Sequence, residues 1–193
     1  MRVIAGTYRG RPLRSLDGEL TRPTTDRVKE ALMSAVVSRL GGFEGLVVLD
    51  AFAGSGALGI EALSRGAEMV WFCERSNAAF RIIKQNVTTL EIDAERYQLQ
   101  RGDVFALVQR GAFPAFDLVF LDPPYAMEAQ EVIGLVEHLY DQGALTSESL
   151  VCYEHAKNDT PAVENACIAL QWHTVSAKDY GQTSIHLLRK DAP

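Results

Sequence analysis

Apolar positions along the chain predict strands that alternate with helices from residue 46 onward. Short apolar runs are typical of buried strands, and we expect strands in five segments: 46–50, 68–74, 96–103, 116–122 and 148–155. Apolar residues recur at helical spacing in three intervening segments: 56–66, 77–90 and 127–140. The tail from Ala166 to Lys190 alternates in places and predicts two further strands, joined around residues 178–182. Strands separated by helices are typical of a doubly wound, mostly parallel α/β sheet, here of seven strands.

The N-terminal part of the chain follows a different pattern. Turn signals and short strand-like pieces fill residues 1–24, and a helix is expected over residues 24–40. One of the polar residues at 24–26 can cap its start, and two glycines end it. We therefore expect an N-terminal arm and helix, residues 1–42, that pack on a single domain formed by residues 43–193.

Charge is distributed unevenly along the chain. The net charge is −6, but seven basic and three acidic side chains give residues 1–29 a charge of +4, which leaves −10 for the rest. A basic arm on an acidic body can contact phosphates locally without a general affinity for nucleic acid. A merely solubilising N-terminus explains the charge equally well.

Composition excludes several classes of protein. Hydrophobic residues make up 47% and charged residues 23%, as in ordinary soluble domains. There is no apolar run of membrane-spanning length and no export signal. Cys73, Cys152 and Cys167 form no metal-binding pattern, and an odd number of thiols fits a reducing compartment. We expect a cytoplasmic protein without a metal site or a membrane contact.

A glycine-rich loop follows the first predicted strand. The sequence GSGALG, residues 54–59, has the GxGxxG spacing that binds NAD, FAD or S-adenosylmethionine. Glu74 ends the next strand about 20 residues on, where it can bind the ribose of any of these cofactors. Asp50 favours S-adenosylmethionine, because a carboxylate would repel a pyrophosphate but attract an ammonium and a sulfonium. Asp103, after the third strand, is placed to accept a hydrogen bond from the adenine amino group.

The sequence LDPPY ends the fourth strand of the alternating region. Pro123 and Pro124 hold the backbone extended and remove two N–H donors, so the segment offers only acceptors, the Asp122 carboxylate and the Pro123 carbonyl. Two acceptors suit an amine with two N–H bonds, because holding both hydrogens directs the nitrogen lone pair toward a donor methyl group. Tyr125 offers a face on which a planar base can stack, worth roughly 1–3 kcal/mol. A turn after a strand would explain the prolines alone.

These motifs resemble the class I S-adenosylmethionine-dependent methyltransferases that modify planar exocyclic or amide nitrogens and carry [DNS]-P-P-[YFW]. Three further stretches are similar to the RsmD family in particular: RVIAGTYRGRPL (2–13), RPTTDRVKEALMSAV (22–36) and YGQTSIHLL (180–188). That bacterial family methylates the exocyclic N2 of one guanine in 16S ribosomal RNA. The resemblance covers nearly the whole chain. It implies a Rossmann-like methyltransferase sheet with a short N-terminal extension, and S-adenosylmethionine as the cofactor, converted to S-adenosylhomocysteine.

The resemblance also implies roles for individual residues. The residues that it implies bind the cofactor are Asp50, Phe52, Gly54, Gly56, Glu74, Asp103, Val104 and Thr24. Asp122 and Pro123 are expected to bind the N2 amine of guanine, and Tyr125 is expected to stack on the base. The resemblance and the charge of the basic arm together predict contacts with substrate RNA for four arginines: Arg9, Arg11, Arg22 and Arg27.

Several alternatives remain open on the residues alone. A carboxylate at Asp122 can accept from both N1–H and N2–H of guanine, whereas adenine suits an asparagine better. Some adenine methyltransferases nevertheless carry D-P-P-Y. An adenine-N6 DNA methyltransferase and a protein glutamine N5 methyltransferase are therefore the alternatives within enzymes. A nucleotide-binding module without chemistry and a small dehydrogenase are the alternatives outside this reaction.

The short chain leaves no room for a separate target-recognition domain, because the predicted sheet occupies residues 46–190. Sequence choice must then come from a preformed substrate surface and the basic arm. We expect the substrate to be 16S ribosomal RNA within an assembled or partly assembled small-subunit ribonucleoprotein. Nothing in the sequence indicates obligate dimerisation, and we expect a monomer.

Overall fold

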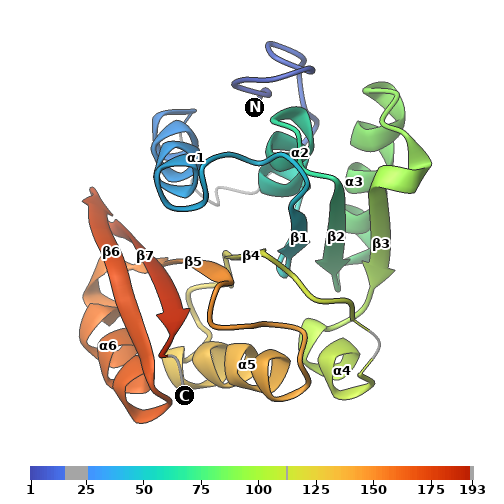
Figure 1. Ribbon diagram of the computed structural model, residues 1–193. Coiled ribbons are helices and arrows are strands. Elements are labelled where there is room, and N and C mark those ends of the chain that lie inside the picture. The colour runs from blue at the N-terminus through green and yellow to red at the C-terminus, as the bar shows by residue number, and fades with distance from the viewer. Residues whose placement is uncertain (16–25, 112, 192–193) are drawn as a thin grey trace. The chain divides into compact units, whose positions relative to one another are not determined.

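The computed structural model of the protein describes residues 1–15, 26–111 and 113–191. The chain divides into two compact units, residues 1–104 and 105–193 (Figure 1). The first unit contains α1 (Asp26–Leu40), β1 (Val47–Asp50), α2 (Ala57–Ser64), β2 (Met69–Glu74), α3 (Asn77–Thr89), the 3-10 turn η1 (Ala94–Arg96) and β3 (Tyr97–Arg101). The short helix α4 (Val104–Gln109) begins at the boundary. The second unit continues with β4 (Leu118–Leu121), α5 (Ala129–Asp141), β5 (Leu150–Ala156), η2 (Lys157–Asp159), α6 (Thr160–Ala169), β6 (Trp172–Tyr180) and β7 (Thr183–Lys190).

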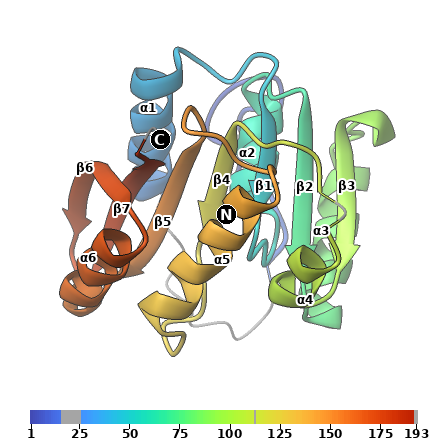
Figure 2. The same cartoon turned by 60° about the horizontal axis from the view of Figure 1, so that its bottom comes forward.

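In the first unit three parallel strands lie in the order β3-β2-β1 (Figure 2). Their apolar side chains are fully buried, as Leu49 of β1 and Phe72 of β2 illustrate. Helix α2 approaches β2 so closely that a Cβ atom added at Gly59 would lie 2.3 Å from the Phe72 ring. Only glycine fits there, because real Cβ atoms do not approach other atoms so closely. The third glycine of the loop is therefore needed for packing of the helix on the sheet.

In the second unit four strands lie in the order β4-β5-β7-β6. β4 and β5 are parallel, whereas β7 runs antiparallel to both β5 and β6. The β6–β7 hairpin turns at residues 181–182 and carries an irregularity between Thr174 and Ser176. The fold class expected from the sequence, an α/β fold with a mostly parallel seven-stranded sheet, is confirmed.

The sequence placed most elements correctly but missed two helices. The tail from Ala166 was expected to form strands, yet residues 160–169 form α6, with a proline in the first turn. Its buried positions, Val163, Ala166 and Cys167, recur at helical spacing but lie among small residues that blur the pattern. The six-residue helix α4 has too few turns for a period to show. The boundary expected after residue 42 stays a prediction.

The three cysteines, Cys73, Cys152 and Cys167, are buried and free. Among the residues described, no helix combines the length and the apolar character needed to cross a membrane.

Candidate active site

Asp50 organises the loop that joins β1 to α2. It is the last residue of β1 and is only 2% exposed. Its carboxylate Oδ2 accepts a hydrogen bond from the Gly59 N–H at 3.0 Å, in the first turn of α2. The acid thus satisfies a helix N-terminal donor and favours the positive end of the helix dipole. Burying a carboxylate at this point also places negative charge directly beneath the glycine loop.

Glu74 joins the glycine loop to the start of the next helix. It ends β2 and is half-buried. Its Oε2 accepts from the Gly54 N–H at 2.8 Å, and its Oε1 accepts from the Ser76 N–H at 2.6 Å. Ser76 in turn caps α3. Each carboxylate oxygen can accept a second hydrogen bond, so Glu74 can hold the loop and still accept from ribose hydroxyls.

Asn86 of α3 also fixes the glycine loop, a role that the sequence analysis missed. It is 2% exposed, and its Nδ2 donates to the Ser55 carbonyl at 2.9 Å and to the Arg14 carbonyl at 3.1 Å. Its Oδ1 accepts from the Arg14 N–H at 2.9 Å. The sequence pattern does mark Asn86, because it lies on the face of α3 that also carries Ile83 and Val87. A polar residue buried on that face needs hydrogen-bond partners.

The other candidate cofactor residues lie along the same strand ends. Phe52 follows β1 and is half-buried. Asp103 and Val104 follow β3; the acid is exposed and the valine buried. The Gly102 N–H donates to the Glu74 carbonyl at 3.0 Å, which holds this segment beside the end of β2. The first unit therefore brings together all candidate cofactor residues except Thr24, which lies outside the described residues.

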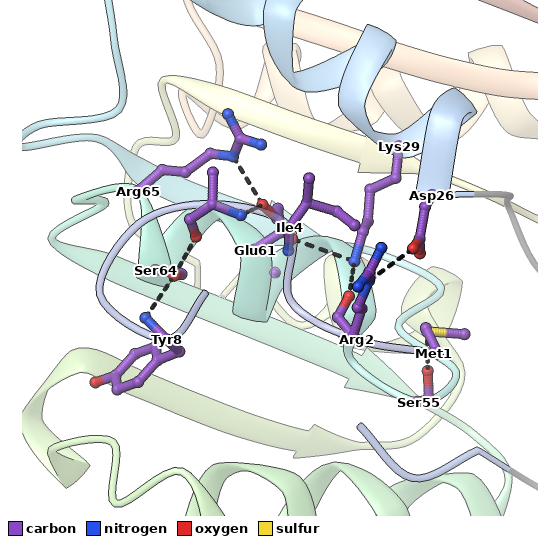
Figure 3. A network of polar contacts seen from close by, with 12 residues as sticks. Met1, Arg2, Ile4, Tyr8, Asp26, Lys29, Ser55, Glu61, Ser64 and Arg65 are labelled. Carbon is purple, nitrogen blue, oxygen red and sulfur yellow. Dashed lines mark hydrogen bonds and ion pairs between the residues drawn. The ribbon is translucent and has the colours of Figure 1, made fainter. Parts of the chain in front are cut away.

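The N-terminal arm, residues 1–15, is held by a buried ion pair (Figure 3). Glu61 of α2 is fully buried and accepts from the backbone N–H of Ile4 at 2.8 Å and of Ala5 at 3.0 Å. It also pairs with Lys29 Nζ of α1 at 3.1 Å and with Arg65 Nε at 2.9 Å. One carboxylate thus ties together the arm, α1 and α2. The sequence predicted that the arm packs on the domain, but not that Glu61 anchors it.

The arm also makes close backbone contacts with the end of α2. Gly6 has a φ of +82°, and a Cβ atom there would lie 1.8 Å from the Ser64 carbonyl oxygen. Ser64 Oγ accepts from the Tyr8 N–H at 2.9 Å. Val3 and Leu13 are buried. The arm is therefore packed on the first unit by apolar and polar contacts, with its arginines left at the surface.

The candidate RNA-binding arginines differ in their surroundings. Arg9 and Arg27 are exposed, and Arg22 lies outside the described residues. Arg11 is exposed and donates from Nη2 to the Thr89 carbonyl at 2.9 Å, at the last residue of α3. Helix α3 starts beside Glu74 and is about 20 Å long. Arg11 therefore lies at the C-terminal end of α3, about one helical turn beyond Asn86, which binds the Ser55 carbonyl of the glycine loop.

In the second unit, the loop after β4 carries the acid, the prolines and the ring. Asp122 follows β4 directly, and burial raises the pKa of its carboxyl from 3.8 to about 6. The Pro124 carbonyl accepts from the Met127 N–H at 2.9 Å, which closes a tight turn. Pro123 is buried, whereas Tyr125 is 48% exposed. The loop thus brings the three candidate catalytic residues together within one unit.

Tyr125 is oriented by β7. Its hydroxyl lies 3.2 Å from Thr183 Oγ1, at the first residue of that strand, and Thr183 is only 7% exposed. A ring fixed at its hydroxyl keeps a defined face toward solvent, as a stacking platform requires. Thr183 lies in the stretch 180–188, whose resemblance to a known family predicted no role for this residue.

Comparisons with known proteins agree with this architecture. A family model described as Conserved hypothetical protein 95 matches residues 1–189. Ribosomal RNA small subunit methyltransferase D of Haemophilus influenzae is 37% identical over 97% of this chain and 92% of its own length. The protein of the same name from Escherichia coli K12 is 34% identical, with coverage of 100% and 91%. The solved structure of Escherichia coli yhhF has a TM-score of 0.80 and 31% identity, and covers 100% of this chain and 99% of that one.

Proposed function

Because this chain belongs to the RsmD family of ribosomal RNA small subunit methyltransferases, we propose that it transfers a methyl group from S-adenosylmethionine to the exocyclic N2 of one guanine in 16S ribosomal RNA. The observation that carries this proposal is the loop after β4. This loop combines the Asp122 carboxylate, the Pro123 carbonyl and the exposed Tyr125 ring. Its two prolines have no backbone N–H to donate.

The glycine loop supports a cationic cofactor rather than a dinucleotide. In phosphate-binding loops the backbone N–H groups point at the anion. Here the Gly54 N–H is directed at Glu74 and the Gly59 N–H at Asp50. Two carboxylates at the strand ends would repel a pyrophosphate but favour the ammonium and sulfonium of S-adenosylmethionine. When bound, S-adenosylmethionine supplies an electrophilic methyl group.

Asp122 and Pro123 would act on the guanine amine by holding its hydrogens. The Pro124 carbonyl is engaged by Met127, which leaves the Pro123 carbonyl as the acceptor that the sequence predicted. With both N2 hydrogens held, the nitrogen lone pair is directed away from the two acceptors. Methyl transfer leaves N2 with one proton too many, and Asp122 Oδ, ionised above pH 6, is the base positioned to take it.

Guanine fits this loop better than the other nitrogen substrates. Its edge presents N1–H and N2–H side by side, and a carboxylate can accept from both. Tyr125 would stack on the base once it is extruded from its helix or presented in a loop. An adenine or a glutamine side chain offers only one donor group beside an acceptor, so the acceptor-only loop favours them less.

We further propose that the substrate is the assembled or partly assembled small subunit, met in the cytoplasm by a monomer of this chain. Methyl groups from labelled S-adenosylmethionine should enter the 16S RNA of such particles about tenfold faster than naked 16S RNA, which corresponds to about 1.4 kcal/mol of added recognition. Incorporation is measured in the RNA fraction of subunits that lack the modification. Equal rates on both substrates would refute the assembled particle as the substrate.

A further inference from the structure

The tip of the β6–β7 hairpin presents a row of side chains that continues from Tyr125. Tyr180 lies directly opposite Thr183, and Lys178 directly opposite Ile185. Residues opposite each other in antiparallel strands share a face, and alternate residues along a strand do the same. Lys178, Tyr180 and Thr183 therefore face one way. Thr183 Oγ1 lies 3.2 Å from the Tyr125 hydroxyl, so this is the face that contacts the loop after β4.

The row is aromatic and cationic. Lys178 is exposed, and its Nζ lies 5.6 Å from the centre of the half-buried Tyr180 ring. The neighbouring acid, Asp179, points to the other face and pairs with Lys157 Nζ at 2.7 Å. Glu154 shares a face with Lys178 through the register of β5 and β7, but it is only 7% exposed. The exposed charge on this face of the tip is therefore positive.

We propose that this hairpin tip is the docking surface for the single-stranded RNA next to the target guanine. The inference rests on the proposed function, because it extends the RNA site from Tyr125. Proteins bind single strands through aromatic rings that stack on bases and cations that follow the backbone, and the tip supplies one of each. Tyr180 stacks on a neighbouring base, and Lys178 contacts a phosphate.

The hydrogen bond to Tyr125 explains why the two rings act together. Thr183 holds the Tyr125 hydroxyl and is the cross-strand neighbour of Tyr180, so both rings are positioned from the same point of the sheet. A base on Tyr125 and a base on Tyr180 would therefore belong to one continuous strand. Recognition at the tip depends little on the bases themselves, because every base has a face that can stack.

The test compares two variants that remove the contacts with two that keep them. Tyr180→Leu removes the ring and Tyr180→Phe keeps it; Lys178→Gln removes the charge and Lys178→Arg keeps it. For methylation of small subunits, Tyr180→Leu should raise KM for the RNA by about 5- to 100-fold while kcat changes little. Lys178→Gln should reduce the slope of log KM against log salt by about 0.7, the value for one phosphate of a single strand. The Phe and Arg variants should behave like the unmodified chain.

The controls separate this inference from the proposal it extends. Affinity for S-adenosylmethionine and the unfolding temperature should be unchanged in all four variants, which shows that each is folded. A wild-type KM for Tyr180→Leu together with an unchanged salt slope for Lys178→Gln would overturn the docking surface. A raised KM with an unchanged salt slope would also overturn it, because it points to a protein partner of the tip. Failure of the unmodified chain to methylate any RNA would instead overturn the proposed function.

Discussion

Replacing Asp122 by Asn is expected to lower kcat/KM for methyl transfer by about 100-fold or more. Asn replaces a charged acceptor by a neutral amide. The NH2 group of this amide is a donor and cannot accept a hydrogen bond from the substrate amine. Hydrogen bonds to a charged group contribute about 1.5–3 kcal/mol, and 100-fold corresponds to about 2.7 kcal/mol. Affinity for S-adenosylmethionine, measured by calorimetry, should not change. In the unmodified chain, kcat/KM should rise with pH through an apparent pKa of about 6, the value to which burial raises the pKa of Asp122.

The same substitution is expected to stabilise the fold at neutral pH. Because the folded-state pKa, about 6, lies above the ordinary 3.8, the folded state binds more protons between these values. The stability of the unmodified chain therefore falls as pH rises through that window. Asn removes this effect, so Asp122→Asn should raise Tm by about 2–6 °C at pH 7.5, allowing for the partial exposure of the side chain. The difference should disappear well below pH 3.8, where the carboxyl is protonated in both states.

The control for both effects is Glu128→Gln, which removes an exposed charge six positions further along the chain. It should leave activity and its pH dependence unchanged. An Asp122→Asn variant that keeps more than a third of the activity would contradict the role given to this acid. A variant that loses activity and also loses stability at pH 7.5 would contradict the burial of an ionised carboxyl.

Replacing Glu61 by Gln is expected to cause the largest loss of stability. The change leaves Lys29, a residue only 1% exposed, with its charge buried and without the ion pair to Glu61, although the bond from Nζ to the Arg2 carbonyl at 2.6 Å remains. Breaking a buried pair in this way costs about 3–5 kcal/mol, or about 6–20 °C in Tm. Thermal unfolding followed by circular dichroism measures the effect.

A matched control is available in the same network. Arg2 and Asp26 form an ion pair at 2.9 Å, but their side chains are 64% and 45% exposed. Arg2→Ala should therefore cost at most about 1 kcal/mol. Replacing Lys29 and Glu61 together by Met should recover part of the loss, because no buried charge then remains unpaired. Equal effects of Glu61→Gln and Arg2→Ala would show that burial does not govern this pair.

Local patterns in the sequence predicted those parts of the structure that rest on local physics. Apolar runs that end in an acid placed Asp50, Glu74 and Asp122 at strand ends, because a strand buried on both faces reads as a continuous hydrophobic segment. The spacing of the glycines predicted the position of the β1–α2 loop. The glycine at position 59 is required because the backbone there lies against the Phe72 ring. Each of these features is encoded within a few neighbouring residues.

The contacts that position the site could not be predicted because they join distant parts of the chain. Glu61 meets residues 4 and 5, Asn86 meets Arg14 and Ser55, and Thr183 meets Tyr125. A single sequence shows only that Glu61 and Asn86 are polar residues among apolar neighbours. Such residues must have partners when buried, but the pattern does not say which.

The most direct test of the proposed activity is mass spectrometry of the nucleosides of 16S ribosomal RNA. Small subunits that lack the modification are incubated with this chain and isotope-labelled S-adenosylmethionine, and the RNA is then digested. We expect the label in N2-methylguanosine, from one position of the RNA. Label in N6-methyladenosine, or label in a ribosomal protein with none in the RNA, would contradict the proposed methylation of guanine N2.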